Sequence, residues 1–211
     1  MEKPVGIDVV RKETKHLKTG DVVGYRGYTI VSALIQLCQS IGQKAKYIKG
    51  DNWKFTHVSI IVNEEWSNGM CSLESTIQHR TGWDGVGLVP LTDRYMNYNG
   101  EIVLYRMNKE LSIEQKNKIR EFYLTHKNKK FERNYVQMIA SAFDGNPKRE
   151  NKKDLSTIFC SELTAQVYID CGLLPLKKPS NEYSPSEFLS SPLNNGFKLV
   201  RGISFKAGIN I

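Results

Sequence analysis

The sequence predicts a single α+β domain in which an antiparallel sheet packs on helices. Its 211 residues, 40 % of them hydrophobic and 25 % charged, suit one globular domain, and no linker or internal repeat divides them. Runs with strand-like composition, bounded by turn residues, occur at 22–25, 55–62, 70–75 and 101–107. Apolar residues recur with helical spacing at 30–41, 112–126 and 160–171.

The N-terminal quarter of the chain predicts one strand and one helix. Turn residues at 17–21 precede the short strand at 22–25. From Ile30 to Ile41 the apolar residues lie along one side of a helix, and a polar loop at 42–54 follows. We therefore expect the sheet to begin at residue 22.

A β-hairpin is predicted around the Asn68-Gly69 turn. In the run 55–62 alternate residues share a face, so Val58, Ile60 and Val62 point one way and His57 points the other. The partner strand at 70–75 carries Glu74 on the face opposite Cys71 and Leu73. Neighbouring strands of this kind would present the histidine and the carboxylate side by side.

The second half of the chain alternates between loops and short elements. Residues 81–99 are rich in Gly, Asp and Asn, so we expect a loop with short strand pieces at 86–91. Ser112 and Gln115 form a capping box for a helix that continues to about His126. Further elements are a charged loop at 144–154, a turn with a short helix at 183–188, and a strand near 197–200.

Cys160 is the most informative single residue. It lies in the run Phe159–Glu162, at the first turn of a helix whose apolar positions recur every four residues and which Gly172 closes. A thiol in this position feels the positive end of the helix dipole, which favours the nucleophilic thiolate. With His57 on a distant strand, it supplies the parts of a nucleophile and general base pair.

The cysteines give no sign of a disulfide framework or of a metal site. Cys38, Cys71, Cys160 and Cys171 are widely spaced, without a Cys-x-x-Cys pair or a zinc pattern. We interpret Cys38 and Cys171 as small buried hydrophobic residues. The pattern implies neither a metal nor an organic cofactor.

The net charge of +8 is concentrated in 109–133 and 148–153. One interpretation is attraction to an acidic polymer or surface. The other is a solvated helix face followed by a polar loop; no nucleic-acid-binding motif is present. The basic residues concerned are Lys127, Lys129, Lys130, Lys148 and Arg149.

Targeting signals are not apparent in this sequence. No apolar run reaches the roughly 18 residues that a membrane helix needs. The first six residues, Met1 to Gly6, lack the apolar centre of a signal peptide. We therefore expect a protein of the reducing cytoplasm.

Several pieces of the sequence, in their order along the chain, resemble the permuted papain-fold hydrolases of the YiiX-like branch of the NlpC-type superfamily. The order of histidine, acid and cysteine is the permuted one. The matching pieces are Gly20-Asp21-Val22-Val23, Tyr25-Arg26-Gly27, Thr56-His57-Val58-Ser59-Ile60-Ile61, Leu73-Glu74-Ser75, Phe159-Cys160-Ser161-Glu162-Leu163 and Tyr183-Ser184-Pro185-Ser186.

This resemblance implies a circularly permuted papain-like (NlpC-type) fold over residues 1–211 and a cysteine hydrolase of the amidase or peptidase (thiol protease) type. It also implies Cys160 as nucleophile, His57 as base and Glu74 as the residue that orients the imidazole. The substrate would be a peptide, a lipid or an acyl amide. The long basic insert between Met107 and Phe159 departs from the family pattern.

Alternatives remain open for the site and for the function. A main-chain N–H group at the start of the cysteine helix is the expected oxyanion donor. Tyr25 is either a second, side-chain oxyanion donor or a packing residue. His79 and His126 are other candidate bases. The fold also resembles that of the lecithin:retinol acyltransferase group, which indicates a thiol-dependent lipid acyltransferase. A third class is a non-catalytic protein that binds through its basic surface.

Overall fold

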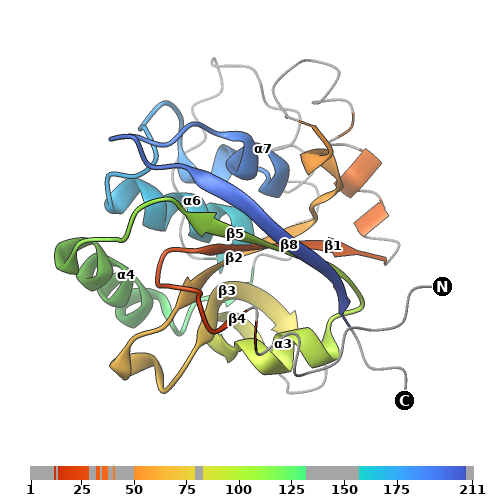
Figure 1. Cartoon of the computed structure of the whole chain (residues 1–211), viewed down its shortest axis with the longest axis horizontal. Helices are drawn as coiled ribbons and strands as arrows, with labels where there is room; N and C mark the ends of the chain where they lie inside the picture. Colours follow the sequence, from red (N-terminus) through yellow and green to blue (C-terminus); the bar gives the residue numbers. More distant parts are fainter. Residues whose placement is uncertain are drawn as a thin grey trace.

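The computed structural model describes residues 12, 14–28, 32, 33, 35–37, 40, 50–78, 83–131 and 157–207 (Figure 1). Its centre is a six-stranded sheet in the order β4-β3-β2-β1-β5-β8, with every neighbouring pair antiparallel. The strands are β1 Val22–Gly27, β2 His57–Val62, β3 Cys71–Gln78, β4 Trp83–Pro90, β5 Gly100–Met107 and β8 Leu199–Ala207. The predicted α+β class is confirmed.

Helices cover both faces of this sheet (Figure 1). Apolar residues of three helices pack on one face, in a core with β1, β2, β3 and β5. These helices are α4 Ile113–His126, α6 Cys160–Asp170 and α7 Pro185–Ser190. The helix α3, Leu91–Asn97, packs on the opposite face. Shorter elements are the 3-10 turns Asn52–Lys54, Glu65–Ser67 and Ser180–Glu182 and the parallel pair β6 Lys130–Phe131 and β7 Thr157–Ile158.

Alternation along β2 divides its side chains between the two cores, as predicted. Val58 and Ile60 belong to the core beneath α6, whereas Ile61 belongs to the core beneath α3 together with Tyr25. The predicted hairpin is also present, because β2 pairs antiparallel with β3. Since side chains alternate, His57 lies on the α3 side of the sheet.

The ladder between β2 and β3 is short, and this positions the cysteine helix. Pairing runs from Val62 opposite Cys71 to Ile60 opposite Leu73, whereas β3 continues beside β4. Beyond the ladder, the buried Ser75 hydroxyl donates to the Ile158 carbonyl at 2.6 Å. The segment that leads into α6 therefore lies against the half of β3 that is not paired with β2.

The helix ends follow the local signals in the sequence. The Ser112 hydroxyl accepts from the Gln115 N–H at 3.2 Å, and the Gln115 side chain accepts from the Ser112 N–H at 3.0 Å. This is the predicted capping box. Gly172 follows α6 with a φ of 70°, a left-handed conformation that favours glycine at a helix end.

The strand piece predicted at 86–91 is present as part of β4, but the prediction of a loop over the rest of 81–99 is wrong, because β4 begins at Trp83 and α3 follows it. In α3, Leu91 and Tyr95 are one turn apart and both are buried. Gly85 has a φ of 123°, and a side chain there would collide with the Lys129 carbonyl, which accepts from the Val86 N–H at 3.0 Å. Gly85, one of the glycines that indicated a loop, therefore allows the main chain at Lys129 to pack closely against the edge of β4.

Other predictions differ in extent or fall outside the described residues. The last strand extends to Ala207 rather than 200. Within the predicted helix at 30–41, the described residues 32, 33, 35–37 and 40 are helical. Outside the described residues lie Cys38, His79, Lys148, Arg149 and the predicted loop at 144–154. None of the helices in the described part of the chain has the length and apolar character needed to cross a membrane.

Candidate active site

Cys160 opens α6 and is 7 % exposed. Its sulfur is hydrogen-bonded by the His57 side chain and by the main-chain N–H groups of Val58 and Ser161. Burial by itself would raise the pKa of this thiol, but His57 and these donors outweigh it and lower the pKa below its ordinary value. The arrangement favours the thiolate.

His57 is the first residue of β2, and 13 % of its side chain is exposed. Its Nε2 lies 2.5 Å from Oε2 of Glu74, which leaves Nδ1 as the ring nitrogen available to the Cys160 sulfur. Burial alone would lower the pKa of the imidazole, but Cys160 and Glu74 raise it to about 9. The opposite directions of the Cys160 and His57 pKa shifts describe a thiolate–imidazolium pair.

Glu74 is fully buried on β3, the strand next to β2. Burial would raise the pKa of its carboxyl group, but Arg94 and then His57 hold it below its ordinary value. The carboxylate is therefore charged although no part of it reaches solvent. The structure thus brings Cys160, His57 and Glu74 together from α6, β2 and β3.

Arg94 belongs to the same cluster and was missed in the sequence. Its Nη2 donates to Glu74 Oε2 at 2.7 Å and lies 3.3 Å from His57 Nε2. The segment was predicted to be a loop, so no face was assigned to this arginine. The four-residue spacing of Leu91 and Tyr95 is the signal that would have revealed the helix.

Tyr25 lies beside the imidazole, but its hydroxyl group points elsewhere. The Tyr25 and His57 rings are 5.0 Å apart between centroids. The hydroxyl group is shared with Ser59 at 3.1 Å and Ser72 at 3.3 Å, and burial raises its pKa to about 12. In this geometry the Tyr25 ring packs against the His57 ring. The Tyr25 hydroxyl group is engaged in hydrogen bonds with serines on the same face of the sheet.

The other described cysteines and the other described candidate base lie in different surroundings. Burial raises the pKa of Cys71, and it raises that of Cys171 to about 12. Cys171 belongs to the core, as predicted. His126 stacks on Phe122 and its Nδ1 donates to the carbonyl of that residue at 2.9 Å, within α4.

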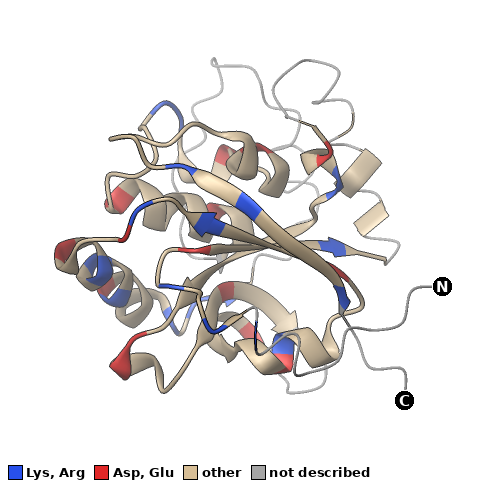
Figure 2. Cartoon of the chain, in the orientation of Figure 1, with Lys and Arg blue, Asp and Glu red and all other residues tan. Residues whose placement is uncertain are grey.

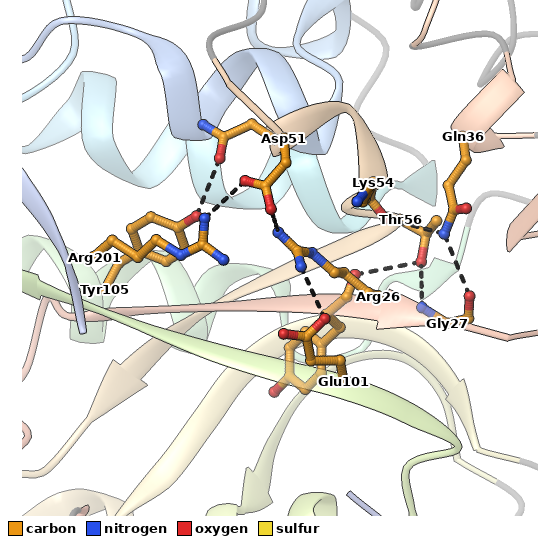
Figure 3. A network of polar contacts seen from close by, with 11 residues as sticks. Arg26, Gly27, Gln36, Asp51, Lys54, Thr56, Glu101, Tyr105 and Arg201 are labelled. Carbon is orange, nitrogen blue, oxygen red and sulfur yellow. Dashed lines mark hydrogen bonds and ion pairs between the residues drawn. The ribbon is translucent and has the colours of Figure 1, made fainter. Parts of the chain in front are cut away.

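A second polar network holds the segment that leads into β2 (Figure 3). The guanidinium group of Arg26 binds Asp51 at 2.6 Å and Glu101 at 2.8 Å, and Arg201 binds the other oxygen of Asp51 at 2.7 Å. The main-chain N–H of Thr56, the residue before His57, donates to the carbonyl of Tyr25 at 2.9 Å. These contacts tie residues 51–56 to β1, β5 and β8.

The described residues contain no group of three or more His, Cys, Asp and Glu side chains that could hold a metal ion. The cluster offers a thiolate, an imidazolium, a carboxylate and a guanidinium group. A thiolate can act as a nucleophile and an imidazolium as a proton donor, and here the carboxylate of Glu74 lies against the ring nitrogen Nε2 of His57.

No protein-family model matches the chain, and no curated protein matches it in sequence. Among solved structures, it is similar to the crystal structure of metalloprotein YiiX from Escherichia coli O157:H7. The TM-score is 0.56 at 16 % sequence identity, and the alignment covers 92 % of this chain and 99 % of YiiX. At this level of identity the likeness concerns the fold.

Proposed function

We propose that this protein is a cysteine hydrolase that cleaves an amide or related acyl bond through Cys160, His57 and Glu74. The observation that carries the proposal is the thiol at the start of α6, whose pKa is lowered by an imidazole that is itself held by a buried carboxylate. A thiol with only a structural role would have a raised pKa, as Cys71 and Cys171 have.

The proposed reaction begins with attack of the Cys160 thiolate on the carbonyl carbon. The imidazolium of His57 then gives its proton to the leaving group, and the imidazole activates the water that hydrolyses the acyl-enzyme. We assign oxyanion stabilisation to main-chain N–H groups in the first turn of α6. Tyr25 has no part in this step, because Ser59 and Ser72 hold its hydroxyl group.

The proposal extends to the fold family. The similarity to YiiX, together with the order of His57, Glu74 and Cys160 along the chain, supports a circularly permuted papain-like fold for the whole chain as one domain. In this fold a histidine strand that precedes the cysteine helix in sequence still meets it in space. The proposal includes no metal-dependent step.

Alkylation by iodoacetamide at about pH 6.5 tests the thiolate. We expect Cys160 to be labelled at least about tenfold faster than Cys71 or Cys171, because its pKa alone among these three is lowered. Mass spectrometry of peptides identifies the labelled site. Faster labelling of Cys71 or Cys38 would remove Cys160 as the nucleophile.

Hydrolysis of an activated ester, p-nitrophenyl acetate, tests whether the thiolate forms an acyl-enzyme. We expect a burst of p-nitrophenol from the native protein and none from Cys160→Ala. The matched control is Cys71→Ala, which removes another buried thiol and should retain the burst. An equal burst from both variants would contradict the proposal.

A further inference from the structure

We propose that Arg94 is a positioning residue of this site, whose guanidinium group neutralises Glu74 so that the Cys160 thiolate remains the counter-ion of the His57 imidazolium. This inference rests on the proposed function. It assigns a role to a fourth residue, in addition to Cys160, His57 and Glu74. Arg94 acts through Glu74, the residue to which its guanidinium group donates a hydrogen bond.

The geometry brings two cationic groups to one buried carboxylate oxygen. Oε2 of Glu74 accepts from Arg94 Nη2 at 2.7 Å and lies 2.5 Å from His57 Nε2. The side chain of Glu74 is 0 % exposed and that of Arg94 is 12 % exposed, so water screens this pair little. The arginine thus competes with the imidazolium for the same carboxylate oxygen.

The fold holds the guanidinium group in a narrow range of positions. It lies 5.1 Å from the Tyr25 ring centroid and 5.6 Å from that of Tyr98. Leu91 and Tyr95, on the same short helix, are buried in the core beneath α3. A planar cation stacked in this way keeps its direction toward Glu74, which a flexible lysine side chain would not do as well.

The charges around the sulfur and the imidazole can be assigned element by element. Arg94 of α3 is positive and Glu74 of β3 negative; Tyr25 of β1 and Tyr98 after α3 are neutral, since burial raises the pKa of both. In the first turn of α6, the Glu162 carboxylate caps the Phe159 N–H at 3.3 Å. The remaining pair is the His57 imidazolium and the Cys160 thiolate.

Removal of Arg94 changes the partner of the imidazolium. Glu74 would then draw the imidazolium toward itself, and its negative charge, no longer neutralised by Arg94, would oppose the charge of the nearby thiolate. Both effects favour the neutral thiol, so the pKa of Cys160 should rise. If Arg94 served only to stabilise the fold of the site, its removal would leave the pKa of Cys160 unchanged.

The test is the rate of Cys160 alkylation as a function of pH in Arg94→Met. We expect the acid limb of the profile to move up by about one pH unit, the size of a nearby-charge effect. Arg94→Lys keeps the charge and should give an intermediate limb. Arg120→Met, a change on the exposed side of α4, is the matched control and should reproduce the native limb.

A double variant keeps the test decisive if Arg94→Met fails to fold. Arg94→Met with Glu74→Gln removes both charges, so the local net charge is unchanged and the limb should return toward the native position. An unshifted limb in Arg94→Met, or no return in the double variant, would overturn the role of Arg94. Failure of the proposed function is a separate result, in which native Cys160 shows no preferential labelling.

Discussion

At the scale of the residue, Glu74 shows how burial and charge are balanced. A buried carboxyl group on its own would take up a proton, yet Arg94 and His57 keep the pKa of Glu74 below its ordinary value. The ionised Glu74 in turn contributes to the raised pKa of His57. One carboxylate therefore both contacts the imidazole and favours its protonated form.

Substitution of Glu74 should separate orientation from charge. Glu74→Gln retains a hydrogen-bond acceptor for His57, whereas Glu74→Ala leaves Arg94 as an unpaired buried cation beside the imidazole. We expect Glu74→Ala to reduce the rate of ester hydrolysis about 10- to 100-fold and Glu74→Gln to reduce it less. Kinetics with p-nitrophenyl acetate measure both variants.

The loss in Glu74→Ala should also carry a pH signature. Without the carboxylate, and with Arg94 nearby, the pKa of His57 should fall from about 9. The alkaline limb of the activity profile, where the imidazolium loses its proton, would then move to lower pH. A variant with native rate and native alkaline limb would show that Glu74 has no part in the reaction.

At the scale of the element, the contact between β3 and β7 positions Cys160, which follows β7 at the start of α6. The Ser75 hydroxyl reaches the Ile158 carbonyl, two residues before Cys160. It does so in the half of β3 that lies beyond the ladder with β2. A buried hydrogen bond thus links the strand of Glu74 to the residues that immediately precede the helix of the thiol.

Ser75→Ala should therefore affect both stability and reactivity. Loss of a donor to a buried carbonyl costs about 1–3 kcal/mol of folding free energy. We expect slower Cys160 alkylation as well, because the start of α6 loses its connection to β3. Thermal unfolding and the alkylation rate measure the two effects.

The matched control for this prediction is the serine that caps a helix outside the site. Ser112→Ala removes the cap of α4 and costs about 1 kcal/mol, but it touches none of the site residues. It should lower stability and leave the alkylation rate unchanged. Equal alkylation rates in the two variants would show that Ser75 does not position Cys160.

The elements themselves differ in how well the sequence predicted them. The alternating run around His57 and the capping box of α4 were predicted closely, because the signals for both are local. The helix α3 was not, because its seven residues lie in a segment rich in turn-forming residues. Its stability comes from burying Leu91 and Tyr95 against the sheet, and this contact is visible only in the fold.

At the scale of the whole molecule, the feature to be tested is the basic surface that follows α4. Figure 2 shows acidic and basic residues intermixed along α4, with Lys118 paired to Glu114 at 3.1 Å. Of the basic residues that follow it, Lys127 and Lys130 are exposed, whereas the carbonyl of Lys129 caps the edge of β4. We therefore expect any acidic partner of this segment to contact the exposed Lys127 and Lys130.

Binding to immobilised heparin, a polyanion, tests this surface. We expect Lys127→Ser with Lys130→Ser to elute at lower salt than the native protein, because surface attraction is screened as ionic strength rises. Lys177→Ser together with Lys198→Ser is the control, since both residues lie far along the chain from this segment. Equal elution of the two double variants would assign Lys127 and Lys130 to an ordinary solvated surface.

The sequence by itself determined the α+β class, the faces of the central hairpin and the identity of Cys160, His57 and Glu74 as candidates. The class and the faces follow from local periodicity, Cys160 follows from residue chemistry at the start of a helix, and the joint roles of the three residues follow from the resemblance to permuted papain-fold hydrolases. Only the tertiary structure decided that Arg94 joins them, since its hydrogen bond to Glu74 spans twenty positions of the chain. It also decided that the Tyr25 hydroxyl group turns to Ser59 and Ser72, because a partner on a neighbouring strand is set by register and packing.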